Sequence, residues 1–79
     1  MKLVAIEWID SCHLPGWVGK EEAEEAGISE CTSVGLIIRK DKKEVVIAQS
    51  YSDTGNYAEI TSIPVCSVVK ITDIGEAYV

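Results

Sequence analysis

The stretch E-C-T-S-V-G-L-I-I-R-K-D-K-K-E-V-V-I-A-Q-S-Y, residues 30–51, decides the fold. Residues 30–40 and 44–51 are apolar and rich in β-branched side chains, which is the composition of β-strands. The polar triplet Asp41-Lys42-Lys43 between them is typical of a tight turn. We therefore predict a β-hairpin in the middle of the chain.

Toward the N-terminus, residues 2–9 are rich in Val, Ile and Trp and alternate in character. The alternation places Val4, Ile6 and Trp8 on one face of a strand. We expect this to be the first strand, with Trp8 filling the core.

The connection between this strand and the hairpin is long. Turn-forming residues occupy 10–16, and K-E-E-A-E-E-A at 20–26 predicts a short helix that stops at Gly27. The acidic residues of this helix are interpreted as a solvated face, with a docking surface for a basic partner as the alternative.

Toward the C-terminus, S-D-T-G-N at 52–56 predicts a second turn, and residues 57–63 resume the strand alternation. Pro64 cannot donate to a sheet, so we expect a 3₁₀ turn at 63–65 before a brief last strand at 68–72. This order predicts a mainly β chain, a small five-stranded SH3-like or Sm-like barrel with one short helix, forming a single domain over residues 1–79.

Length and charge restrict the partners. A chain of 79 residues buries one thin core, which favours assembly into a homo-oligomer. A net charge of −6 repels a long phosphate backbone, so long nucleic acid is disfavoured. A compact nucleotide stays possible, because a few local donors and an aromatic surface are sufficient to hold it.

Cysteine usage and hydropathy indicate the compartment. Cys12, Cys31 and Cys66 are odd in number and widely spaced, which disfavours a disulfide framework. The chain shows no signal peptide and no apolar run long enough for a bilayer, so we expect a cytoplasmic protein that does not bind membranes. Cys31 and Cys66 lie within apolar patterns and are expected to be small buried residues.

Candidates for catalysis are weak. The only histidine, His13, follows Cys12 directly, and neighbours on an extended segment point to opposite sides. A zinc site from Cys12, His13, Cys31 and Cys66 lacks the C-x-x-C spacing that preorganises two ligands. The glycines form no phosphate-binding motif. We expect no catalytic residues, metal or cofactor, and rank an enzyme behind two binding functions.

Aromatic and hydrogen-bonding side chains gather in two loops, residues 10–17 and 51–57. Aromatic rings stack on bases, and hydroxyl and amide groups donate to phosphate or base edges, so the combination suits a nucleotide. The alternative keeps Trp17 as a cap on the barrel and the second cluster as an ordinary turn. The candidate ligand-binding residues are Ser11, His13, Trp17, Tyr51, Ser52, Thr54, Asn56 and Tyr57.

Four short motifs resemble a widespread family of very small phage proteins, and the resemblance covers nearly the whole chain. They are W-x-D-S with P-G-W (Trp8, Asp10, Ser11, Pro15, Gly16, Trp17), S-V-G-L-I-I (33–38), V-I-A-Q-S (46–50) and I-P-x-x-x-V-x-K-I (63–71). This family is similar to the phage anti-CBASS sponges, small multimeric binders that sequester cyclic oligonucleotide immune signals without cleaving them.

The resemblance implies a phage immune-evasion protein in the host cytoplasm, with a cyclic di- or trinucleotide held near Ser11, His13 and Trp17. The loop at 51–57 would close the site from the same or a neighbouring subunit. The acidic balance departs from what an anionic ligand favours. The alternative function is an SH3-like protein-interaction module that inhibits or recruits a host protein.

Overall fold

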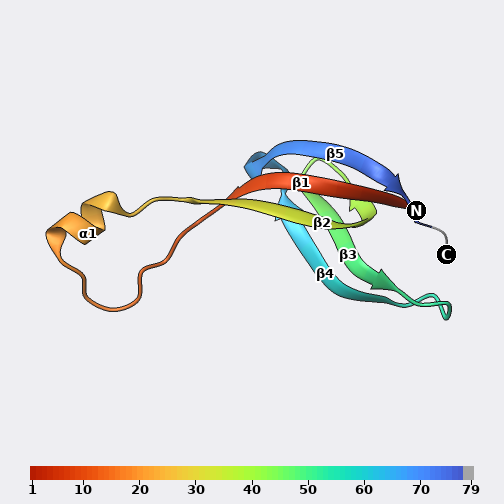
Figure 1. Ribbon diagram of the computed structural model, residues 1–79, viewed down its shortest axis with the longest axis horizontal. Coiled ribbons are helices and arrows are strands. Elements are labelled where there is room, and N and C mark those ends of the chain that lie inside the picture. Colours follow the sequence, from red (N-terminus) through yellow and green to blue (C-terminus); the bar gives the residue numbers. More distant parts are fainter. Residues whose placement is uncertain (78–79) are drawn as a thin grey trace.

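The computed structural model describes residues 1–77 and contains five strands, a short helix and a 3₁₀ turn (Figure 1). The elements in chain order are β1 (Lys2–Asp10), α1 (Lys20–Glu25), β2 (Ser29–Lys40), β3 (Glu44–Tyr51), β4 (Tyr57–Pro64), η1 (Val65–Ser67) and β5 (Val68–Glu76). The predicted order of elements is confirmed. The last strand is longer than expected, and the 3₁₀ turn begins two residues later.

All strand pairings are antiparallel, and the five strands form one sheet in the order β4-β3-β2-β1-β5. The first strand lies between the second and the fifth, with Ala5 opposite Val34 on one side and Thr72 on the other. The fold is therefore mainly β. Within residues 1–77 no pairing joins β4 to β5, so these two strands are the open edges of the sheet.

The core occupies one face of this sheet. Its buried members are Val4 and Ile6 of β1, Val45 and Ile47 of β3 and Ile63 of β4. Trp8 is partly buried and packs against them, and its indole Nε1–H donates to Ser33 Oγ at 3.0 Å. The predicted alternation of β1 is therefore confirmed, because Leu3, Ala5 and Glu7, which alternate with these residues, are not part of this cluster.

The opposite face of the sheet also carries apolar side chains. Residues that face one another across paired strands share a face, and Leu3, Leu36, Ala48 and Ile60 are successive cross-strand partners from β1 to β4. Val34, two residues before Leu36, lies on the same face. Leu36 and Ala48 are buried, whereas Val34 and Ile60 are about half exposed, at 50% and 52%. We call these five residues the outer apolar row.

Both edges of the sheet are irregular. On β5 the register slips at two places, which leaves Val69 and Ile74 as extra residues beside β1. On β4, Glu59 has a φ of 56°, which interrupts the extended backbone in mid-strand. Bulges and kinks of this kind oppose edge-to-edge pairing with another sheet.

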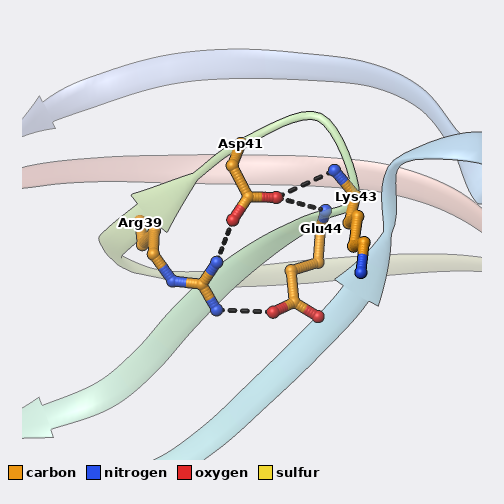
Figure 2. A network of polar contacts seen from close by, with 4 residues as sticks. All are labelled: Arg39, Asp41, Lys43 and Glu44. Carbon is orange, nitrogen blue, oxygen red and sulfur yellow. Dashed lines mark hydrogen bonds and ion pairs between the residues drawn. The ribbon is translucent and has the colours of Figure 1, made fainter.

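The turn between β2 and β3 is fixed by a polar network (Figure 2). Asp41 Oδ1 accepts hydrogen bonds from the backbone N–H groups of Lys43 and Glu44, at 2.8 and 3.0 Å, and the guanidinium of Arg39 pairs with both Asp41 and Glu44. The two backbone bonds, then the Arg39 charge, lower the pKa of Asp41. The hydrogen bond to Glu44 raises the pKa of Arg39, which stays charged.

This network predicts an acid-dependent contribution to stability. Because the pKa of Asp41 is lower when folded than when unfolded, its contribution is complete above the unfolded pKa and is lost as the pH falls through the folded pKa. We expect Asp41→Ala to reduce stability at neutral pH and to flatten the stability profile in the acid range. Urea unfolding from pH 7 down to acid checks this, and parallel profiles for the two proteins would contradict it.

Candidate functional site

The first candidate loop lies on an arm, residues 11–28, that projects away from the sheet (Figure 1). Every residue from 10 to 30 is exposed. Ser11 donates its backbone N–H to Asp10 Oδ1 at 2.8 Å, which turns the chain out of β1. His13 is exposed on the same arm. Trp17 is fully exposed, at 104%, so the interpretation of Trp17 as a cap on the fold is wrong for this chain.

Helix α1 is carried at the outer part of the arm (Figure 1). It has no buried residue, and Lys20 forms an i,i+4 ion pair with Glu24 at 3.8 Å. Glu21 and Glu22 lie in its first turn, where the helix dipole favours negative charge. A helix of six residues is too short to be stable by propensity alone.

The second candidate loop is a compact turn between β3 and β4. Ser52 N–H donates to the Asn56 carbonyl at 2.8 Å, and Gly55, with a φ of 89°, donates to the Ser52 carbonyl at 3.0 Å. The Ser52 and Thr54 hydroxyls lie 2.6 Å apart, and Asn56 Nδ2 donates to Thr54 Oγ1 at 3.3 Å. The polar side chains predicted to bind a ligand, Ser52, Thr54 and Asn56, thus hydrogen-bond to one another and stabilise the turn.

Two aromatic rings close the base of this turn. Tyr51 and Tyr57 are cross-strand partners, with ring centroids 4.9 Å apart and planes at 63°. This edge-on arrangement is a favoured one for aromatic pairs. Tyr51 is partly buried and Tyr57 is 41% exposed, so part of the pair faces solvent.

The structure does not bring the two loops together within one chain. The molecule measures 52 Å along its longest axis, against 23 and 21 Å across it, and the two loops lie at opposite ends of that axis (Figure 1). Ser11, His13 and Trp17 belong to the arm, and Ser52, Thr54 and Asn56 belong to the turn between β3 and β4. A site using both sets needs two copies of the chain.

A pocket that the sequence did not indicate lies where the arm leaves the sheet. Its volume is about 360 Å³ and it is lined by Glu7, Trp8, Ile9, Glu30, Cys31, Thr32 and Val69. The lining comes from the outer ends of β1 and β2 and from the Val69 bulge of β5. A strand bulge cannot be read from the alternation, and no local signal marked these residues as a site.

The cysteines and ionisable groups form no further cluster in the described part of the chain. Cys12 and Cys66 are exposed, and Cys31 is partly exposed. The expectation of a buried Cys66 is wrong because this residue falls in η1, between two strands, and not inside one. Among residues 1–77 no three His, Cys, Asp or Glu side chains converge as metal ligands, and no helix has the length and apolar character to cross a bilayer.

Comparisons with protein-family models, with curated proteins and with solved structures find no match to this chain.

Proposed function

We propose that this chain is a non-catalytic binding protein that sequesters a cyclic oligonucleotide between two of its own copies. The observation that carries the proposal is the placement of two aromatic surfaces, Trp17 and the Tyr51–Tyr57 pair, at opposite ends of one molecule. An exposed ring face offers a stacking surface to any base, at about 1–3 kcal/mol per base. A phage origin and a role in immune evasion rest on the resemblance of the sequence motifs.

The arm supports the first half of the site. Trp17 has no packing role in its own chain, so its ring is free to stack without any cost to the core. His13 and Ser11 lie on the same exposed segment and add an imidazole and a hydroxyl as donors.

The second turn supports the other half. Its internal hydrogen bonds fix the Ser52, Thr54 and Asn56 side chains in place before any ligand arrives. Preorganised donors lose less entropy on binding. Asn56 Nδ2 carries a second hydrogen, and the partly exposed Tyr57 carries a phenol, so the turn offers donors of its own to a phosphate oxygen.

We also propose that the sheet is curled into a small SH3-like or Sm-like barrel. The strand order, the buried cluster on one face of the sheet and η1 between β4 and β5 support this. The Val65 N–H donates to the Lys43 carbonyl at 2.8 Å, which ties the start of the 3₁₀ turn to the end of the β2–β3 turn.

Removing the Trp17 ring is the direct test. Isothermal titration calorimetry of the unmodified chain against a panel of cyclic dinucleotides and trinucleotides is expected to find at least one ligand. Trp17→Ala should then weaken its binding about 5- to 150-fold through the loss of one stacked base, and Trp17→Phe should restore most of it. Ligand recovered intact after denaturation of the complex distinguishes sequestration from hydrolysis.

Ile74→Ala, at a half-exposed position on the far edge strand, is the matched control and should leave affinity unchanged. The absence of heat with every member of the panel at tens of micromolar protein would reject the proposal.

A protein-interaction module is the second candidate. The apolar side chains of the arm, Leu14, Trp17, Val18 and Ile28, are all exposed, and such a surface also fits a protein groove. A pull-down with the unmodified chain and with Trp17→Ala separates the two functions. Nucleotide binding without a captured host protein favours sequestration, and the reverse favours the module.

A further inference from the structure

The single chain is not compact. Its radius of gyration is 16.1 Å, whereas a compact domain of this length has a value of about 12 Å. The arm accounts for the difference, because it extends the long axis beyond the sheet (Figure 1).

The exposed surface is correspondingly large. The chain exposes 5998 Å², against about 4,700 Å² expected for a folded monomer of its mass. The excess is about 1,300 Å², which is more than the roughly 800 Å² per partner that a stable interface of standard size buries. An interface that covers the arm would therefore bring the surface of each chain into the range of ordinary folded proteins.

The base of the arm needs support from outside the chain. The pairs Ile9–Glu30 and Asp10–Ser29 extend the β1–β2 ladder beyond Val68, the first residue of β5, which lies opposite Trp8. The β3 ladder on the other side begins only at Leu36. A ribbon of two strands without a third is marginally stable in water, so the projecting arm is expected to pack on something.

Charge and apolar character point to a second copy as the cover. Helix α1 holds four glutamates and one lysine, and four of the chain's seven basic residues lie at 39–43, in the β2–β3 turn. Arg39 is paired within its turn, but Lys40, Lys42 and Lys43 are exposed, as are Glu21, Glu22 and Glu25. The arm holds α1 away from its own sheet, so these opposite charges are placed to meet between chains (Figure 1).

We propose that two copies form a two-fold dimer by reciprocal arm exchange. Each arm lies across the outer apolar row of the partner, where Leu14, Val18 and Ile28 cover Val34 and Ile60. The glutamates of α1 approach the partner's basic turn. A two-fold axis makes both contacts identical, which closes the assembly at two copies. The irregular edges of β4 and β5 disfavour the competing edge-to-edge association.

Analytical ultracentrifugation over a concentration series tests the dimer. The unmodified chain should sediment with twice the 8.6 kDa mass of one chain. Ile60→Asp places a charge in the outer apolar row and should raise the dimer dissociation constant about tenfold or more. Val69→Asp, at a more exposed apolar position on β5, is the matched control and should leave the dimer intact.

A charge exchange at exposed positions supplies a second test that does not depend on the fold of β4. Lys40, Lys42 and Lys43 changed together to glutamate should weaken the dimer, as should Glu21, Glu22 and Glu25 changed together to lysine. Both sets in one chain should restore it, because the contact is reciprocal.

A monomeric unmodified chain, or a dimer that none of these variants weakens, would overturn the proposal. The proposed dimer follows from the exposed surface of the chain and is independent of which ligand it binds. A dimer that binds no cyclic nucleotide would therefore contradict the proposed function alone, and a chain that dimerises only after a cyclic nucleotide is added would contradict the arm exchange alone.

Discussion

Ile6→Ala is expected to lower the free energy of unfolding by about 2–5 kcal/mol, the range for removing a fully buried aliphatic side chain and leaving a cavity. Ile6 is 0% exposed and lies in the cluster formed by Val4, Val45, Ile47 and Ile63. A domain of this length has a total stability of about 4–12 kcal/mol. The substitution thus removes a large share of it.

Urea unfolding at one fixed protein concentration measures the loss, since self-association would otherwise shift the midpoint. Ile74→Ala makes the same chemical change at a position that is 50% exposed and should cost much less. Equal losses for the two variants would show that the cluster around Ile6 is not the core of the protein.

Gly35→Ala is the second substitution with a large expected effect. A Cβ at this position would lie 2.8 Å from the backbone oxygen of Ala48 and 3.2 Å from the Cβ of Ile47. Neither atom is the end of a flexible side chain, so the backbones of β2 and β3 must separate. We expect a loss of about 1–3 kcal/mol or more, as for other overpacked cores.

Gly27→Ala is the matched control, because a Cβ there meets nothing within 4 Å. It should leave the unfolding midpoint nearly unchanged. Two-dimensional NMR of Gly35→Ala should show shifts concentrated on β2 and β3. Wild-type stability for Gly35→Ala would mean that the two strands are not in the contact described above.

Local patterns in the sequence are sufficient to predict the order of strands and helices. The alternation of Val4, Ile6 and Trp8 identified the face of β1 that packs on the core, and the Asp41-Lys42-Lys43 triplet marked the turn. β4 ends at Pro64, as predicted from the missing N–H group of proline. Each of these signals acts over a few residues, which is the range in which sequence patterns are reliable.

The arrangement of the loops could not be read in the same way. Nothing local distinguishes a long connection that folds over a sheet from one that projects, so the sequence leaves open whether Trp17 and the second turn meet within one chain. The polar residues of 52–56 were recognised, but their use in holding the turn depends on backbone geometry at Gly55. The pocket beside Trp8 is lined in part by Val69, which a register slip leaves as an extra residue, and the alternation of the sequence does not reveal such a slip.

The position of β1 between β2 and β5 has a consequence for how the protein forms. Lys2 pairs with Glu76, so the ladder that completes the sheet joins residues separated by almost the entire described chain. Such contacts form only after a long loop has closed, which costs conformational entropy before any contact stabilises the chain, and this makes folding slow. During synthesis the first strand must wait, paired at most with β2, until β5 leaves the ribosome, and its apolar face stays open to other chains for that interval.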